Sequence, residues 1–487
     1  MTQGADSPEP EQLPRVLGLF DATMIVVGSI IGSGIFLKVS AVDSQLAPYG
    51  VLAILGTWLF VGLITLCGSL ALAELGAMYP NAGGPYLYIR ESFGQLPAFL
   101  WGWTEFWVVR TGSVGALACA TVLYFNQLVQ LSSLQQTLMA IAIVIGLSAA
   151  NYRSTSVGAG IQSLATVTKV GFLAALILLP FIWKGAASAN FHPLWTTPVE
   201  PGGWGGFARA LGIAMVAVLW PYDGWINLGP VAEDIRNPMK NVPRAMAIGL
   251  ALVITVYSGA NISYHAVLPM SHLSASQTVA ADVFQVMFGP VGGSIAAIGV
   301  MISTFGATNS NMITGPRIYL AIARDGLVPA WLQKIHPRYL TPANTIVLQA
   351  VWTILLVLLF SFWTPNAAVG DGVSGGTEQL YVAFDNLTNS VICAGLIFYG
   401  LAVAAVFVLR MTKPHADRPY RTWGYPLTPA LLLTAYAGAF VSLLTEQPAQ
   451  TISVLLLIGA GVIYYMCARL IVSRRRTSRG GRVVEAG

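Results

Sequence analysis

Long apolar runs separated by short polar stretches dominate the chain. A run of roughly 18 to 25 apolar residues is long enough to cross a bilayer as a helix, and these runs lack the alternation of barrel strands. The pattern predicts twelve membrane-spanning helices, near residues 16–38, 49–73, 96–125, 135–151, 157–183, 206–231, 243–268, 285–323, 342–363, 379–410, 425–444 and 450–472. The eighth run is too long for one straight span, and we expect its end, RIYLAIARDGLVPAWLQKIHP, to include an amphipathic cytoplasmic segment.

Composition supports the same interpretation. Hydrophobic residues make up 55% of the 487 and charged residues 9%, whereas a soluble domain carries about 25% charged residues. Only helices and closed barrels satisfy their backbone in lipid, so the sequence predicts an all-α membrane protein. We expect residues 1–15 to be a disordered cytoplasmic tail without a cleaved signal peptide, residues 16–472 to form one transmembrane domain, and residues 473–487 to be a basic cytoplasmic tail.

The basic residues orient the predicted helices. Of the 25 Lys and Arg residues, the predicted outer segments contain only Lys38, Lys184 and Arg209. Those inside the spans are Arg110, Lys169 and Arg317. The rest fall on the inner side if both termini are cytoplasmic, which is a strong positive-inside bias for a multi-pass protein of the cell membrane. Anionic lipid accounts for the basic tail RRRTSRGGR, and we expect no nucleic-acid partner.

Glycine and proline interrupt two spans in corresponding positions. The first span contains VVGSIIGSGIF, and the sixth, five spans later, contains WPYDGWINLGP. Secondary transporters bind substrate where such breaks face each other in an inverted repeat. The sequence therefore predicts a five-plus-five inverted repeat, about 16–183 and 206–410, with discontinuous helices 1 and 6 and two more helices at about 425–472. A close helix-packing face at Gly28 and Gly32 is the alternative explanation of the first break.

The two breaks together predict a site for an α-amino acid. In the first, free N–H groups at the start of the following half-helix favour a carboxylate; they belong to Ser33, Gly34 and Ile35. In the second, backbone carbonyls are free to accept hydrogen bonds from an ammonium group; they lie near Trp220, Pro221 and Tyr222.

Charged residues inside predicted spans are functional candidates by default. Lys169 can occupy a cation site and bridge first-span carbonyls to polar groups of the eighth span, or it can snorkel to an interface. The eighth-span candidates are Thr308, Asn309, Ser310 and Asn311. Asp223, in the sixth-span break, can meet the substrate or a proton, or pair with a buried cation. We assign no chemistry to Arg110 or Arg317.

Enzyme motifs are weak or absent. The sequence contains neither a phosphate-binding G-x-x-x-x-G-K-[ST] loop nor an H-E-x-x-H pair. The G-x-S-x-G pattern at residues 372–376 falls in a predicted outer loop instead of a strand–turn–helix. The four cysteines lie in apolar runs and the five histidines are scattered. We therefore expect no enzyme activity, no cofactor and no metal site.

Several ordered motifs resemble the amino acid–polyamine–organocation superfamily, especially its L-type amino acid transporter branch. They are VVGSIIGSGIF, LALAELGAMYPNAGGPYLYI, WPYDGWINLGPVAEDIRNPMKNVPRAM and FGATNSNMITGPRIYLAIARDGLVPAWLQKIHPRYLTP. The resemblance implies a LeuT-like fold and sodium-independent uptake or exchange of L-amino acids. It also implies that residues 32–34 bind the carboxylate, that Ile30 lies in the pocket, that Trp220 is an aromatic gate and that Lys169 replaces a sodium ion.

Two departures from the family pattern limit this inference. Asp223 stands where many L-type members have glycine, which favours small polar or cationic side chains over large neutral ones. The segment FNQLVQLSSLQQ has no cysteine, so we expect no disulfide-linked heavy chain. A polyamine or organic-cation transporter and a sensor that binds without transport remain alternatives. The choice between exchange and proton-coupled uptake stays open.

Overall fold

The computed structural model describes residues 15, 17–80, 83–153, 155–183, 185–198, 202–324, 326, 328–362 and 376–484. The regular secondary structure of these residues is helical, without strands, apart from an isolated bridge between Leu17 and Ile235. The predicted N-terminal tail, except Arg15, and the G-x-S-x-G pattern, except Gly376, lie outside the described residues.

The helices follow the apolar runs of the sequence. The first half contains α1 (Leu19–Ile30), α2 (Gly34–Leu37), α3 (Val39–Leu46), η1 (Ala47–Tyr49), α4 (Val51–Met78), α5 (Pro85–Phe93), α6 (Gln95–Thr104), η2 (Glu105–Arg110), α7 (Thr111–Phe125), α8 (Ser133–Arg153), α9 (Thr155–Ile182) and η3 (Ser188–Phe191). The second half contains α10 (Gly203–Leu219), η4 (Trp225–Asp234), α11 (Pro238–Val267), α12 (Met270–Ala275), α13 (Val279–Arg324), η5 (Ala330–Gln333), α14 (Ala343–Phe362), α15 (Gly376–Thr412), α16 (Leu427–Glu446) and α17 (Pro448–Val484).

Eleven helical segments of the described chain are long and apolar enough to cross a membrane. They coincide with eleven of the twelve predicted spans. The exception is the sixth, where α10 is a shorter apolar helix that ends at Leu219 and is followed by the irregular residues 220–224. The all-helical membrane class is confirmed, and the shortened sixth helix reflects the Pro221 and Gly224 interruption.

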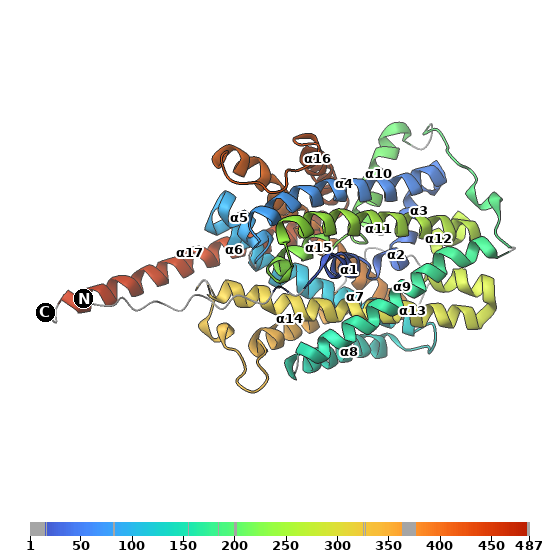
Figure 1. The fold of residues 1–487 in the computed structure, drawn as a ribbon. Coiled ribbons are helices and arrows are strands. Elements are labelled where there is room, and N and C mark those ends of the chain that lie inside the picture. Colours follow the sequence, from blue (N-terminus) through green and yellow to red (C-terminus); the bar gives the residue numbers. More distant parts are fainter. Residues whose placement is uncertain are drawn as a thin grey trace.

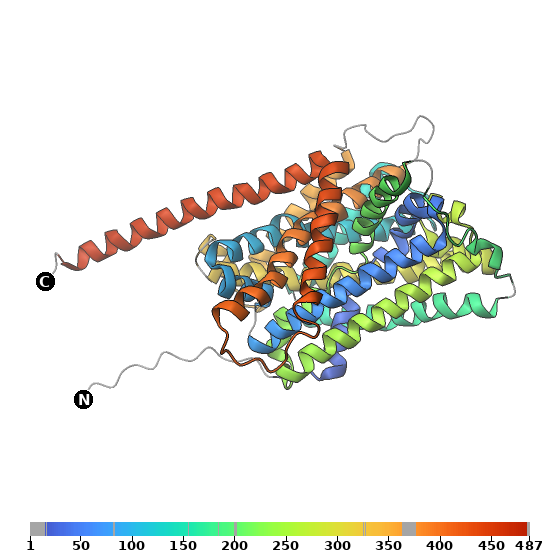
Figure 2. The same ribbon diagram turned by 90° about the horizontal axis from the view of Figure 1, so that it is seen from above.

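The helices form one bundle with two distinct ends. Figures 1 and 2 show α3 and α12 near one end and α5 and the start of α6 near the other. In the same views α17 projects well beyond the bundle as one long helix, and it continues past the predicted span to Val484. Within the bundle, α11 packs along α4 and α1, while α13 packs against α7 and α9.

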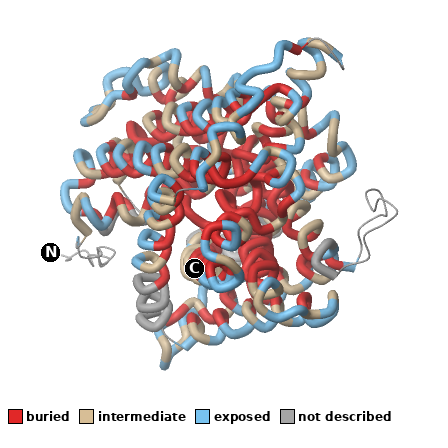
Figure 3. The backbone as a smooth tube through the Cα atoms, turned by 90° about the vertical axis from the view of Figure 1, so that its right-hand side faces the viewer, coloured by how far each residue is buried: buried red, intermediate tan, exposed pale blue. Residues whose placement is uncertain are grey.

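The outer surface of the bundle is apolar as well as the core. Figure 3 shows buried residues gathered in the centre and exposed residues around the periphery. Many of the exposed side chains are large and hydrophobic, including Leu59, Phe60 and Leu63 of α4. Apolar residues on the outer face of a helical bundle are what contact with lipid acyl chains requires.

Two long helices depart from regular geometry. In α13, Gly289 has a positive φ of 69° and divides the 46 residues into two helical parts. The eighth apolar run, expected to be too long for one straight span, begins just before this kink. Between α6 and α7, η2 is a π-helical turn of six residues inside an otherwise continuous span. Such turns widen a helix locally and occur often at functional sites.

Candidate functional site

The first break separates α1 from α2 and leaves backbone donors free. Helix α1 ends at Ile30, and α2 begins at Gly34. Among the described residues, no acceptor pairs with any of the four N–H groups from Gly32 to Ile35. Unpaired N–H groups in a buried segment need a partner, and a carboxylate supplies acceptors of suitable charge.

The carbonyl groups of the first break are occupied. Lys169 Nζ, fully buried on α9, donates to Gly28 O at 2.9 Å and to Ile31 O at 2.7 Å. Ser303 Oγ of α13 donates to Gly32 O at 3.2 Å. The unwound segment therefore has its acceptors paired and its donors unpaired, which gives it a net preference for an anionic group.

The second break is packed directly against the first. A Cβ atom on Gly34 would lie 2.4 Å from Pro221 Cα, and a Cβ atom on Gly224 would lie 2.5 Å from Ser29 O. Gly224 also has a φ of +100°, which L-residues with side chains rarely adopt. Glycine is thus required at both crossing points, and at Gly34 this close approach is a reason for glycine in addition to ligand access.

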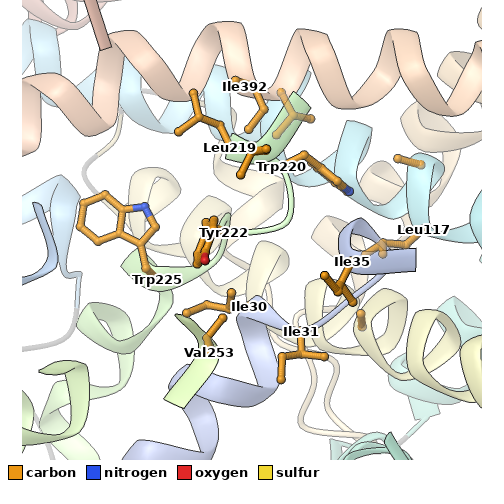
Figure 4. Close-up of a cluster of buried hydrophobic side chains, with 14 of the residues drawn as sticks. Ile30, Ile31, Ile35, Leu117, Leu219, Trp220, Tyr222, Trp225, Val253 and Ile392 are labelled. Carbon is orange, nitrogen blue, oxygen red and sulfur yellow. The ribbon is translucent and has the colours of Figure 1, made fainter. Parts of the chain in front are cut away.

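Side chains connect the two breaks. Trp220 Nε1 donates to Ser33 Oγ at 3.0 Å. The Tyr257 hydroxyl lies 2.9 Å from Pro221 O and 3.3 Å from Ile30 O. In Figure 4 the Trp220 indole nitrogen points toward the side of Ile35 and Leu117, whereas Tyr222 is turned toward Ile30.

A small cavity lies between the two breaks. Its volume is about 30 Å³, room for about two water molecules. Its lining includes the predicted residues Ile30, Gly32, Ser33, Gly34, Trp220, Asp223 and Asn311. Six further residues complete the lining: Gly224, which was expected only to interrupt the sixth span, and five that the sequence did not single out, Ser29, Ser113, Leu117, Asn227 and Ala307. Ile35 and Pro221 do not line it, and Tyr222 lines a neighbouring cavity of about 10 Å³ that also reaches Asp223.

Asp223 presents an unpaired oxygen at this site. The Asp223 carboxylate interacts with the charge of Arg110, the backbone N–H of Gly224 and the Tyr399 hydroxyl, but its Oδ1 atom has no hydrogen-bond partner among the described residues. A buried carboxylate oxygen without a donor is costly. The cavity therefore offers a position for a ligand group that donates a hydrogen bond.

The predicted eighth-span residues are divided between two environments. Asn309 accepts a hydrogen bond from Asn151 Nδ2 at 2.8 Å, and Thr308 bonds its own helix. Asn311 reaches the cavity, whereas Ser310 does not line it. Both hydrogen bonds described for Lys169 go to the first span. Ser303 of α13, which precedes the FGATNSNMITG motif, donates a hydrogen bond to the break, and Ala307 within the motif packs beside Gly32.

Arg110 is the main residue whose place at the site the sequence did not reveal. It is 4% exposed and donates from Nε to Glu105 Oε2 at 2.7 Å, from Nη1 to Asn311 Oδ1 at 3.0 Å and from Nη2 to Asn227 Oδ1 at 2.7 Å. Two of its three partners line the cavity. A signal was present in the opposite charges at positions 105 and 110 of one span, a spacing that suits a π turn.

Comparison with known proteins agrees with this geometry. The sequence profile of the amino acid permease family matches residues 17–473. The chain belongs to the amino acid permease family. The permease is 30% identical over 474 residues to the serine/threonine exchanger SteT of Bacillus subtilis, covering 94% of this chain and 98% of SteT.

Animal relatives are similarly distant. The permease is 28% identical to the mouse b(0,+)-type amino acid transporter 1, covering 93% of this chain and 88% of the relative. It is 31% identical to the human large neutral amino acids transporter small subunit 2, covering 90% and 77%. These relatives are transporters, so the chain is an amino acid transporter of the membrane and not an enzyme.

Proposed function

We propose that the permease is a secondary transporter that moves L-amino acids by alternating access and without sodium. The proposal includes twelve spans, the five-plus-five inverted repeat, both termini in the cytoplasm and residence in the cell membrane. The observation that carries it is the set of unpaired N–H groups of residues 32–35, buried directly beside the second break. These groups bind the substrate carboxylate, and the carbonyls of residues 220–222 receive its ammonium group once the two breaks separate. Trp220 O and Pro221 O each already accept one hydrogen bond, from Asp223 N and from the Tyr257 hydroxyl, and each keeps a second lone pair for the ligand.

Lys169 takes the part of a bound cation in this proposal. Unwound carbonyls at such breaks are suited to coordinating Na⁺ or a proton-bearing group. Here an ammonium group already lies on two of them, Gly28 O and Ile31 O. A fixed charge at this position stabilises the break without a sodium ion, which supports sodium-independent transport.

The polar lining of the cavity supports polar amino acids as substrates. The cavity of about 30 Å³ admits no amino acid until the two breaks separate, but its lining carries the polar side chains of Ser33, Asn227 and Asn311. Asp223 Oδ1 offers an acceptor to the side chain. Together with the relative named as a serine/threonine exchanger, this leads us to propose exchange of serine, threonine and similar amino acids.

A cationic substrate is the second candidate, and the same Asp223 oxygen favours it. A carboxylate attracts an ammonium or guanidinium group in a buried site. Competition separates the two: inhibition of labelled threonine uptake by putrescine, but not by alanine, selects an organic-cation transporter.

We further propose that this chain works without a disulfide-linked heavy chain. One relative is named a small subunit, but FNQLVQLSSLQQ of this chain has no cysteine.

Counterflow in proteoliposomes tests the function. Purified permease is reconstituted with internal unlabelled threonine, and the accumulation of external labelled threonine is followed with and without sodium and with and without a pH gradient. We expect accumulation that needs internal substrate and does not need sodium. Binding without accumulation would instead identify a sensor, and strict sodium dependence would overturn the role given to Lys169.

A further inference from the structure

A buried arginine lies directly behind the side-chain end of the cavity. Arg110 and Glu105 are the last and first residues of the π-helical turn η2, and both are almost completely inaccessible. Their ion pair uses the Nε donor of the guanidinium. The other two guanidinium nitrogens, Nη1 and Nη2, donate to residues of α13 and η4, namely Asn311 and Asn227.

Arg110 dictates how these two amides are oriented. A guanidinium has only hydrogen-bond donors, so an amide that contacts it must present its carbonyl oxygen. Asn227 Oδ1 lies 2.7 Å from Nη2 and Asn311 Oδ1 lies 3.0 Å from Nη1. The NH₂ group of each amide consequently points away from Arg110.

The NH₂ groups of the two amides differ in whether they have a hydrogen-bond acceptor. Asn311 Nδ2 donates to Ala307 O of its own helix at 3.0 Å. Asn227 Nδ2 has no acceptor in the described part of the chain, and Asn227 lines the cavity between the breaks. The amide of Asn227 is therefore fixed by its oxygen and has a donor left for a ligand.

Asp223 lines the same cavity, and its buried Oδ1 is a complementary acceptor that has no partner among the described residues. A hydroxyl group both donates and accepts one hydrogen bond, so it can satisfy Asp223 and Asn227 together. An apolar side chain of the same size would leave both buried groups unpaired, and sites built to bond a hydroxyl discriminate strongly against analogues that lack it.

We propose that Arg110 is a positioning residue for side-chain selectivity: it holds the Asn227 amide with its N–H groups toward the cavity, so that hydroxyl-bearing amino acids are preferred over apolar ones of equal size. This inference rests on the proposed function. Glu105 helps to hold the guanidinium in this orientation, because its carboxylate accepts the hydrogen bond from Arg110 Nε.

Threonine and valine provide the test because they have nearly the same shape and differ by one hydroxyl. The measurement is the ratio of kcat/KM for threonine over valine in proteoliposomes, with valine also measured as a competitor of labelled threonine. Three variants are compared with the unaltered permease. Asn227→Asp keeps an acceptor for Arg110 but has no N–H, and Arg110→Lys keeps the charge beside Glu105 but lacks the planar fork. Asn344→Asp is a matched control: Asn344 is half-buried, does not line the cavity, and loses a comparable amide hydrogen bond, to Trp331 O.

We expect the unaltered permease and Asn344→Asp to prefer threonine by about tenfold or more. In Asn227→Asp and in Arg110→Lys the ratio falls to within about threefold of unity, while valine transport or inhibition persists. Equal loss of both substrates in Arg110→Lys, with an unchanged ratio in Asn227→Asp, would give Arg110 a purely structural role and overturn the proposal. An unaltered permease without preference overturns it too, whereas transport of neither amino acid refutes the proposed function itself.

Discussion

The two breaks present opposite kinds of chemistry to the same cavity. The first contributes the unpaired backbone N–H groups of residues 32–35, and its carbonyls are bound by Lys169 and Ser303. The second contributes side chains, Asp223 and Asn227, of which one has an unpaired oxygen and the other is fixed by Arg110. Backbone groups are the same whatever the substrate side chain is, so the first break suits the α-carboxylate that all amino acids share.

This difference implies that the two breaks have separate roles in substrate binding. Changes at the first break should alter transport of all substrates together, whereas changes at the second should alter the choice among them. The predictions below test this division, and their effects are largest where backbone groups lose their partners.

Lys169→Ala removes the buried partner of two first-break carbonyls. Each unpaired carbonyl in the membrane interior costs several kcal/mol, so we expect transport of every substrate to fall by about 1,000-fold. Counterflow of threonine and alanine is measured after insertion has been confirmed by membrane extraction. Lys334→Ala, on an exposed lysine, is the control, and full activity of Lys169→Ala without any new sodium dependence would contradict the role of this ammonium group.

Gly34→Ala forces the two breaks apart. The new Cβ would lie 2.4 Å from Pro221 Cα, an atom of the backbone that cannot rotate away. A misplacement of about 1 Å costs about 100-fold in rate, and we expect that loss in kcat/KM for threonine, serine and alanine alike. Gly146→Ala, where a Cβ would meet no atom within 4 Å, should transport normally, and a substrate-dependent loss in Gly34→Ala would refute the proposed division.

Asp223→Asn tests the second break. The amide keeps the shape but loses the negative charge and one acceptor, so we expect inhibition of threonine uptake by lysine to weaken about tenfold. Inhibition by alanine should change less than twofold, since alanine has no group that reaches Asp223. Asp417→Asn, on an exposed aspartate, controls for charge, and an unchanged competitor profile would reduce Asp223 to a structural residue.

The sequence predicted the helices better than the contacts between them. Long apolar runs fix where helices cross, because lipid leaves the backbone no alternative, and eleven of the twelve expected spans have membrane-length helices. The sixth was harder because Pro221 and Gly224 shorten α10 without an equally apolar continuation. Gly289, which kinks α13, gave no distinct signal among the many glycines of the chain.

The site was foreseen where it depends on the backbone and missed where it depends on packing. Gly32 and Gly34 mark an unwound segment in any apolar run, and Lys169 stands out as a charge among apolar residues. Arg110, by contrast, reaches Asn227 only because η2 widens the helix and η4 passes beside it. Ser303, which precedes the predicted polar residues of the eighth span, donates the α13 hydrogen bond to the first break, since the rotation of α13 is set by its packing on α7 and α9.

The hydrogen bond between Trp220 and Ser33, which joins the two breaks, is expected to change transport least when it is removed. Trp220 Nε1 and Ser33 Oγ form one hydrogen bond, 3.0 Å long, across the cavity. The Ser33 N–H, which is the proposed carboxylate donor, is unaffected by truncation of the side chain. Since one hydrogen bond contributes about 1 kcal/mol, Ser33→Ala and Trp220→Phe should each lower kcat/KM by only about fivefold.

The double variant, Ser33→Ala with Trp220→Phe, shows whether loss of this hydrogen bond causes the effect of each single substitution. If both substitutions act by removing the same hydrogen bond, their combination should cost no more than the larger single change. Independent effects would multiply to about 25-fold and would mean that Trp220 acts through packing on Phe384, whose ring centre lies 6.3 Å away. Because the hydrogen bond joins the two breaks, threonine and valine should be affected equally, and a change in their ratio would assign Trp220 to side-chain selection together with Asp223 and Asn227.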